Sequence, residues 1–520
     1  VPGNDRYNHQ STAVWCFDKA SGRGRPRVMA ELHIEYTDGR RDIVVTDTSW
    51  KSTDSPVIFN SIYTAEHYDA RKELPGWDSS GYGDSTWENA LAAVAPTQNI
   101  VSQQMCPVRI TDTLTPIKTV KVNERLYRFH FARNIAGIAD LRIKGKRGTQ
   151  LRIKHSEKIN PDGSLNMANI DYHFRPTDDS DPFQTDIMIL SGGEDHFRPR
   201  FNYKGFQYIE IMADGPIEIS EGDLIALELH SDVPDIGRID SSNETINSIH
   251  RAGRSSYLAN LFGYPTDCPQ REKNGWTGDG HFAIETGLYN FDGITVYEKW
   301  LRDFQDAQRP DGVLPGIIPT SVWGYDWGNG IDWTCAVAVI PWQIYRFYGD
   351  NSLLLEMYGT IKKLVDYVTS ISPEGTTDWG LGDWIPYKAV SNPELTSSVF
   401  YYVTADILAK AAGMKGHDDE CRQYGMLAEK IKGAINDKFL DRGKGIYCDG
   451  TQTELSVPLF WGVVPDDIRP LVAENLHKRV EADGFHLDVG VHGARALLCA
   501  LSENGYAQTA YRVASQETFP

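Results

Sequence analysis

The spacing of apolar residues changes near residue 233, and this change divides the chain into two kinds of structure. Before it, apolar and polar side chains alternate, as in RVMAELHIEY (27–36), which an Asp38-Gly39 pair follows. A period of two predicts half-buried β-strands, and the Asp-Gly pair predicts a hairpin turn. LRIKGKRGTQLRIKH (141–155) and FQYIEIM (206–212) continue this pattern. We expect two β-sandwich domains, at 1–105 and 106–232.

After residue 233 the apolar period is close to 3.6, which is typical of amphipathic helices. Ser241 or Ser242 can cap the first helix. Its apolar face is expected to hold Ile246, Ile249, Gly253 and Tyr257. Further helices are expected at 292–304 (capped by Asp292), 351–368, 419–440, 466–482 and 490–503. Tandem helices joined by long loops rich in Gly, Trp and Asp predict an α/α toroid whose loops at one end build a site.

The amino-acid composition limits the classes of ligand and partner that the chain can bind. With 52 basic and 71 acidic residues the net charge is −19, so the chain lacks the cationic surplus that nucleic-acid binding requires. Aromatic residues reach 11%, and flat rings can stack on the apolar faces of neutral ligands such as sugars. The seven cysteines show no CxxC spacing, so neither a zinc site nor a disulfide framework is expected. No apolar run approaches the roughly 20 residues of a membrane helix.

One stretch, DCPQREKNGWTGDG (267–280), concentrates charge around a tryptophan. Its glycines, Gly275, Gly278 and Gly280, are expected to let the backbone turn tightly, so that three carboxylates can converge. Glycoside hydrolysis requires two carboxyl groups, one protonated and one ionised. The alternative is a charged surface loop with helix caps and a buried tryptophan.

The same stretch resembles the signature of bacterial α-L-rhamnosidases, glycoside hydrolase family 78. In that family Asp-Cys-Pro-x-Arg and an acidic residue precede Gly-Trp-x-Gly-Asp. The similarity extends to YTAEHYDARKELPGWD (63–78), FARNIAGIADLRIKGKRGTQLRIKHSE (131–157), FNYKGFQYIEI (201–211), GNGIDWTCAVAVIPWQIYRFYGD (328–350) and GLGDW (380–384). The resemblance implies two N-terminal β-sandwich domains followed by an all-α (α/α)6 barrel at 233–520. It also implies that the first β-domain is truncated at its start and the barrel at its end.

The resemblance also implies roles for single residues. Glu272 would be the general acid. Hydroxyl groups of rhamnose would be bound by Asp267, Arg271, Asp279 and, as a weaker candidate, Asp332. The apolar wall that faces the sugar's 6-methyl group would consist of Trp276, Trp333 and Trp384. Each tryptophan taken alone is more often part of a core than of a ligand-binding wall.

The family inverts at the anomeric carbon, so a second carboxylate must act as general base, roughly 6.5–9.5 Å from the first. In the family this base follows a Pro-Ser-Trp segment late in the barrel. The chain ends in YRVASQETFP, which resembles the residues just before that segment, so we expect the base outside this chain. Asp383, Glu454 and Asp488 are internal alternatives, but nothing in the surrounding sequence favours them.

No cofactor is expected, because acid, base and water suffice, and no metal site is assigned. His486 and His492 lack the spacing of a metal-binding helix. The two roles that stay open for these histidines are helix capping and contact with the substrate. The expected partner is a rhamnose-containing oligosaccharide or glycoside, with no nucleic acid and no membrane. A periplasmic or secreted role fits the family, whereas the aglycone and the oligomeric state stay open. Two other classes stay open: a non-catalytic carbohydrate-binding relative, and another α/α-toroid enzyme, either an inverting glycosidase or a polysaccharide lyase.

Overall fold

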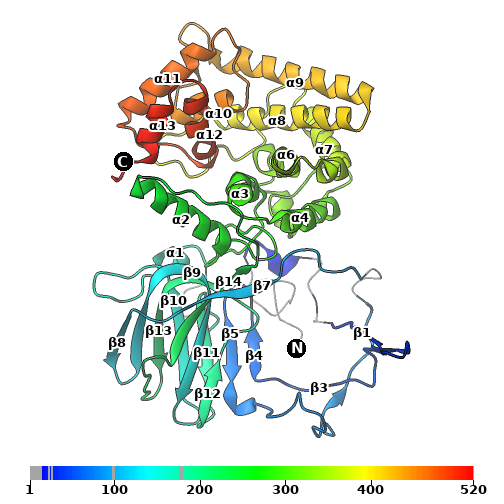
Figure 1. The fold of residues 1–520 in the computed structure, drawn as a ribbon, viewed down its shortest axis with the longest axis vertical. Helices are drawn as coiled ribbons and strands as arrows, with labels where there is room; N and C mark the ends of the chain where they lie inside the picture. The colour runs from blue at the N-terminus through cyan, green and yellow to red at the C-terminus, as the bar shows by residue number, and fades with distance from the viewer. Residues whose placement is uncertain (1–13, 21–23, 25–26, 96–99, 175–179, 519–520) are drawn as a thin grey trace. The chain divides into compact units, whose positions relative to one another are not determined.

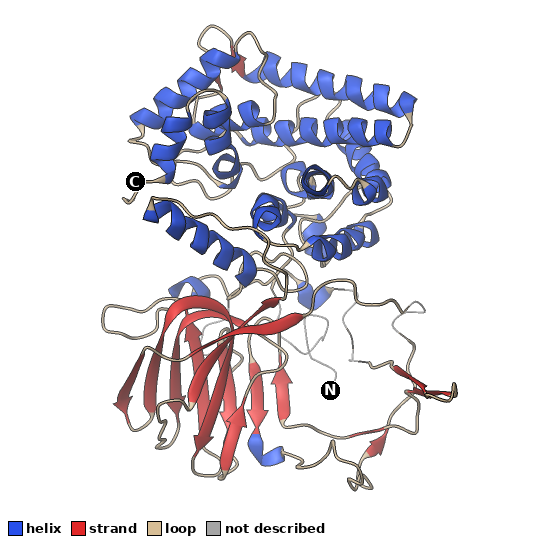
Figure 2. Ribbon diagram, in the orientation of Figure 1, coloured by secondary structure: helices blue, strands red, loops and turns tan. Residues whose placement is uncertain are grey.

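The computed structural model describes residues 14–20, 24, 27–95, 100–174 and 180–518 (Figure 1). The chain divides into two compact units. The first contains Val1–Gln103, Val108–His230 and the short segment Cys268–Lys273, and the second contains Gln104–Pro107, Ser231–Asp267 and Asn274–Pro520. Strands dominate the first unit and helices the second (Figure 2). The change in apolar period near residue 233 therefore falls close to the division between the units.

The first unit is built around a ten-stranded sheet in the order β4-β5-β11-β10-β13-β9-β14-β7, with β8 and β12 also paired to β9. Its strands are β4 (Val57–Asn60), β5 (Glu66–Asp69), β7 (Val108–Leu114), β8 (Lys118–Asn123), β9 (Leu126–Lys144), β10 (Gln150–Ser156), β11 (Thr185–Ile189), β12 (Glu194–Phe197), β13 (Lys204–Ala213) and β14 (Leu224–Ser231). The alternation predicted around the glycine-rich turn is confirmed, because Leu141, Ile143, Leu151 and Ile153 are all buried in one core. Strand β5 pairs in parallel with β11, so the sheet continues across the boundary expected at residue 105.

The predicted hairpin is present as β1 (Glu31–Glu35) and β2 (Arg41–Val45), which pair antiparallel. Its expected half-burial is wrong, since Leu32 is 59% exposed and Ile43 is 58% exposed. Among the described strands these two pair only with each other, as do β3 (Lys51–Ser52) and β6 (Glu88–Asn89). A two-stranded ribbon without a third strand or an opposing layer has nothing to bury either face.

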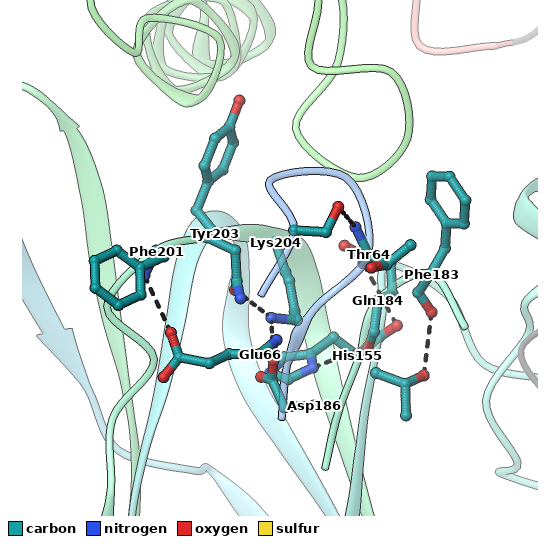
Figure 3. Close-up of polar contacts among 12 residues, drawn as sticks. Thr64, Glu66, His155, Phe183, Gln184, Asp186, Phe201, Tyr203 and Lys204 are labelled. Atoms are coloured by element: carbon teal, nitrogen blue, oxygen red, sulfur yellow. Dashed lines mark hydrogen bonds and ion pairs between the residues drawn. The ribbon is translucent and has the colours of Figure 1, made fainter. Parts of the chain in front are cut away.

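Three strands of the large sheet are joined by buried polar groups (Figure 3). The Lys204 ammonium on β13 donates to Asp186 Oδ1 on β11 at 2.7 Å, and both side chains are fully buried. The same carboxylate oxygen accepts from the backbone N–H of Glu66 on β5 at 2.9 Å. The Glu66 carboxylate accepts from two backbone N–H groups, and burial raises its pKa to about 7. Burial also lowers the pKa of neighbouring His155 to about 3.

The helices of the second unit pack around one large apolar core, except α2 (Glu244–Ala259), whose buried Tyr257 belongs to a smaller cluster with Leu261 and Phe291. The others are α3 (Thr277–Asn290), α4 (Ile294–Ala307), α5 (Ile331–Thr334), α6 (Ala336–Tyr348), α7 (Ser352–Ile371), α8 (Pro393–Met414), α9 (Asp418–Phe439), α10 (Gln452–Phe460), α11 (Arg469–Ala482), α12 (Val491–Glu503) and α13 (Ala507–Ala514). Each helix expected from the 3.6 period is present. Long antiparallel neighbours such as α8 and α9 lie side by side (Figure 1).

Two predicted helix caps are wrong. The N-cap of α2 is Asn243, whose side-chain oxygen accepts from the backbone N–H groups of Thr245 and Ile246, whereas Ser241 and Ser242 lie before it. Helix α4 begins after Gly293, and the Asp292 carboxylate instead accepts from the Tyr348 hydroxyl. Ile249, expected on the apolar face of α2, is 53% exposed.

All seven cysteines lie in the described residues and are free thiols, which confirms that the chain has no disulfide framework. None of the helices in the described ranges is long and apolar enough to cross a membrane.

Candidate active site

The motif stretch 267–280 spans the end of the loop that follows α2 and the first turn of α3, and most of its residues are buried. Asp267, Arg271, Glu272 and Asp279 are half-buried, and the other ten residues of the stretch are buried. The predicted acid and the three predicted hydroxyl-binding residues of this stretch are therefore the ones that keep partial exposure. Such selective exposure in a packed loop is not what a solvated charged loop would show, because its polar side chains would be exposed throughout.

Two hydrogen bonds between Asp267 and Asn274 close the loop part of this stretch. Asp267 N–H donates to the Asn274 carbonyl at 3.0 Å, and Asn274 N–H donates back to Asp267 Oδ1 at 2.9 Å. Trp276 is the N-cap residue of α3, and Asp279 lies in the first turn of that helix. The positive end of the helix dipole stabilises a carboxylate there.

The glycines of the motif serve a different purpose from the one expected. None of the three has a positive φ; the residue of this stretch in the left-handed region is Lys273, with φ 51°. Instead, each glycine allows a close approach. A Cβ on Gly275 would lie 2.0 Å from the Ile318 carbonyl oxygen, and one on Gly280 would lie 2.5 Å from the Trp300 ring. A Cβ on Gly278 would lie 2.4 Å from Trp333 Nε1.

Gly278→Ala is expected to lower the free energy of unfolding by about 1–3 kcal/mol, since the buried Trp333 ring cannot move away without strain elsewhere. The matched control is Gly253→Ala in α2, where a Cβ meets nothing within 4 Å. That change should raise stability by about 0.5–1 kcal/mol through helix propensity. Urea unfolding followed by near-UV circular dichroism measures both, and equal stability of Gly278→Ala and wild type would refute the packing role.

Four tryptophans of the second unit form a connected aromatic cluster. Trp276 meets the edges of Trp323 and Trp327 with ring centroids 6.0 and 5.8 Å apart. Trp323 and Trp327 stack at 5.2 Å, and Trp327 meets Trp384 at 5.9 Å. Trp327 is 39% exposed and Trp384 is 42% exposed, so these two rings offer apolar faces to a ligand.

The three predicted wall residues therefore differ in position. Trp384 is exposed, whereas Trp276 and Trp333 are almost completely buried, and Trp333 packs against Phe282 and His492. Sequence reasoning missed Trp323 and Trp327. The stretch VWGYDW (322–327), a pair of tryptophans four residues apart shortly before the predicted Asp332, was the available signal.

Asp332 does not fit the predicted contact with a sugar hydroxyl. Its side chain is fully buried and accepts from the backbone N–H groups of Leu381 (3.2 Å) and Gly382 (2.8 Å). Ser397 Oγ lies 3.4 Å away and His492 Nε2 lies 3.7 Å away. These donors compensate the cost of burying the Asp332 carboxylate. In return, Asp332 fixes the GLGDW loop (380–384), which carries Trp384.

The three internal alternatives for the base are also engaged in holding loops. Asp383 accepts from the backbone N–H groups of Gly490, His492 and Gly493. Glu454 closes a capping box with Thr451. Asp488 accepts from the backbone N–H groups of Lys388 (2.7 Å) and Ala389 (2.9 Å). We assign the general base to none of them.

Neither of the two histidines left open by the sequence caps a helix in the described part of the chain. The His492 ring is buried among Phe282, Trp333 and Phe400, and the N-cap of α12 is Gly490. His486 Nε2 lies 2.9 Å from Thr518 Oγ1.

The segment Cys268–Lys273 carries Arg271 and Glu272 and belongs to the first unit. Glu272 Oε2 accepts from the indole N–H of Trp15 at 2.5 Å. The Lys273 ammonium donates to the carbonyl oxygens of Ile62 (2.7 Å) and Tyr203 (2.6 Å). These contacts could not be anticipated, because no local pattern links Glu272 to a residue 257 positions away.

Family comparisons agree with this organisation along the whole chain. Residues 234–520 match the bacterial alpha-L-rhamnosidase six-hairpin glycosidase domain, residues 2–112 the alpha-L-rhamnosidase N-terminal domain, and residues 120–230 the bacterial alpha-L-rhamnosidase concanavalin-like domain. Two β-domains followed by a helical-hairpin glycosidase domain define the class of protein: a multidomain glycosidase fold. Since the first of these matches covers more than half of the 520 residues, the chain belongs to the bacterial alpha-L-rhamnosidase family.

Individual relatives support this membership. An alpha-L-rhamnosidase of Streptomyces avermitilis is 30% identical over 503 residues, which cover 95% of this chain and 47% of the relative. An alpha-L-rhamnosidase of Formosa agariphila is 29% identical over 565 residues, which cover 100% of this chain and 57% of the relative. The chain thus spans about half the length of the curated relatives it matches.

Solved structures give the same fold. The alpha-L-rhamnosidase structure from Dictyoglumus thermophilum has a TM-score of 0.89 at 33% identity, covering 100% of this chain and 57% of that one. A Streptomyces avermitilis alpha-L-rhamnosidase solved in complex with L-rhamnose has a TM-score of 0.88 at 28% identity, covering 99% and 49%.

Proposed function

We propose that this protein is an inverting α-L-rhamnosidase that releases terminal α-L-rhamnose from glycans or glycosides. The observation that carries the proposal is the exposure pattern of the motif stretch. Within 267–280, Asp267, Arg271, Glu272 and Asp279 are half-buried and all their neighbours are buried. Membership of the rhamnosidase family, and the L-rhamnose bound to a relative of the same fold, support rhamnose as the sugar.

In the proposed mechanism Glu272 donates its proton to the glycosidic oxygen as the bond to the anomeric carbon breaks. Asp267, Arg271 and Asp279 hold sugar hydroxyls through charge-assisted hydrogen bonds, which fix the ring for attack by water. The exposed faces of Trp327 and Trp384 suit the 6-methyl group of rhamnose, because an apolar surface binds a methyl group without leaving a polar atom unpaired. The base that activates the water is not assigned to a described residue.

The test is hydrolysis of 4-nitrophenyl α-L-rhamnoside by the full-length natural protein, with proton NMR identifying the anomer released first. We expect β-L-rhamnose as the first product, because an inverting enzyme uses two carboxyl groups and a single displacement. The α-L-mannoside, which differs only by a 6-hydroxyl, should react up to about 10²-fold more slowly. Binding of rhamnose without turnover would favour a non-catalytic relative, and turnover of another glycoside alone would favour a different inverting glycosidase.

A further inference from the structure

The segment that carries the proposed acid is held closely inside the first unit. Gly205 makes room for it, since a Cβ there would lie 2.8 Å from Pro269 Cγ and 3.1 Å from Gln270 Cβ. The Gly205 carbonyl is in turn fixed by Gln184 Nε2, which donates to it at 2.6 Å (Gln184 is shown in Figure 3). Gln184 itself has a left-handed backbone with φ 60°. A non-glycine residue persists in that conformation only where its surroundings hold it.

Lys273 anchors the residue next to Glu272. Its side chain is almost completely buried, and its ammonium donates to the carbonyl oxygens of Ile62, Tyr203 and, at 3.5 Å, Tyr63. Three carbonyl acceptors match the three N–H bonds of an ammonium group. The Lys273 backbone is also left-handed, with φ 51°. Lys273, the residue after Glu272, is therefore fixed by both its backbone and its side chain.

Trp15 reaches the Glu272 carboxyl group itself. Its indole N–H donates to Oε2 at 2.5 Å, and its ring meets the edge of Phe174 at 6.1 Å. Trp15 and Cys16 have positive φ values of 48° and 59°, and the flanking Val14 and Phe17 are buried. The strained turn at Trp15 is thus held by apolar anchors on both sides, and it directs the indole N–H to one carboxyl oxygen.

We propose that Trp15 is a positioning residue that determines which oxygen of Glu272 carries the acidic proton; this inference rests on the proposed function. An indole N–H can only donate a hydrogen bond. Oε2 is therefore the acceptor whether Glu272 is neutral or ionised. Since the carbonyl oxygen of a neutral carboxyl group accepts more strongly than its hydroxyl oxygen, this contact favours the proton on Oε1. A general acid must present its proton within hydrogen-bond reach of the leaving oxygen, so a proton fixed on one oxygen is already in place.

In the transfer step the Oε1–H bond breaks and its proton bonds to the glycosidic oxygen. The electrons of the bond between that oxygen and the anomeric carbon leave with the oxygen, and the attacking water forms the new bond to the carbon. The electron pair of the Oε1–H bond stays on the carboxylate, which becomes negatively charged. The Trp15 N–H then donates to an anion instead of a neutral carboxyl group, and such a charge-assisted hydrogen bond is stronger. Trp15 therefore stabilises the charge that develops during the reaction.

The kinetic test is Trp15→Phe, which keeps an aromatic ring against Phe174 and removes the N–H. We expect kcat for phenyl α-L-rhamnoside, a substrate that needs protonation, to fall by about 10-fold or more with little change in KM. For 2,4-dinitrophenyl α-L-rhamnoside, whose leaving group departs unprotonated, we expect less than about a 3-fold loss. The matched control is Trp50→Phe, which removes an exposed indole hydrogen bond to the Val45 carbonyl and should change neither rate.

A second measurement tests the contact without relying on activity. The indole N–H resonance of Trp15, assigned by its absence in Trp15→Phe, should shift in Glu272→Gln and stay in place in Glu244→Gln, a change on the surface helix α2. An unshifted resonance in Glu272→Gln would overturn the inference, and so would equal losses of kcat on both substrates in Trp15→Phe. A shifted resonance in a protein that hydrolyses no rhamnoside would overturn the proposed function instead, and with it the role of the contact in proton transfer.

Discussion

Glu272→Gln is expected to lower kcat for phenyl α-L-rhamnoside by about 10²–10⁴-fold, the usual contribution of a positioned general acid. The amide keeps the size of the side chain and can still accept from the Trp15 indole, but it has no proton to give to the glycosidic oxygen. The loss should shrink to about 10-fold or less for 2,4-dinitrophenyl α-L-rhamnoside, because dinitrophenolate leaves without protonation. Steady-state kinetics on the two substrates measures the difference.

Two further measurements isolate this effect. Isothermal titration of Glu272→Gln with L-rhamnose should give an affinity close to that of wild type, since the hydroxyl-binding residues are unchanged. Glu244→Gln in α2, an exposed carboxylate paired with Arg251, is the control and should retain wild-type kcat on both substrates. Full activity of Glu272→Gln on phenyl α-L-rhamnoside would assign the acid to another residue.

The second large effect is expected for stability. Lys204→Met should lower the free energy of unfolding of the first unit by about 3–5 kcal/mol, because it leaves the Asp186 carboxylate buried without a countercharge. The methionine chain replaces the apolar stem of lysine, so lost packing contributes little to the expected change. Urea unfolding followed by near-UV circular dichroism measures the loss.

The double variant Lys204→Met/Asp186→Asn separates charge from packing. The asparagine can still accept from the Glu66 backbone N–H, and no unpaired charge remains, so about 2 kcal/mol or more of stability should return. Lys144→Met removes an exposed ammonium 4.0 Å from Glu194 and should change stability by less than about 0.5 kcal/mol. No recovery in the double variant would mean that lysine packing, and not the buried charge, accounts for the loss.

How much of the helical unit could be predicted depended on the contrast between the faces of each helix. Helices α7 and α9 have one buried and one exposed face, so their period is visible in the sequence. Helix α8 (Pro393–Met414) was not predicted, because residues on nearly all of its sides are buried and an amphipathic period is therefore missing. A pattern also shows which residues share a face without showing whether anything covers that face, which is why the exposed β1–β2 hairpin was expected to be half-buried.

The candidate site divides in the same way. Asp267, Arg271, Glu272 and Asp279 are contiguous in one motif, so the sequence could bring them together, although their roles remain predictions. For Asp332 the predicted role, binding a sugar hydroxyl, differs from the one in the structure, and for the glycines the predicted role, a tight turn, differs as well. The carboxylate is fully engaged by backbone N–H groups, and Gly278 admits Trp333 instead of turning the chain. Sequence alone could not supply contacts made by residues distant in the chain.

Because Cys268–Lys273 belongs to the first unit, the two units of this chain cannot be separated by one cut in the gene without disrupting this segment. A gene cut at the division near residue 230 would encode a helical domain that keeps Asp267, Asp279 and the tryptophan cluster. The six-residue segment with Glu272, the proposed acid, would then lose the backbone carbonyls that accept from Lys273 and the indole N–H that donates to Glu272. The β-region and residues 268–273 therefore behave as one structural unit, so exchanging Trp15 or its neighbours for the residues of a relative would change the surroundings of Glu272 without altering Asp267 or Asp279.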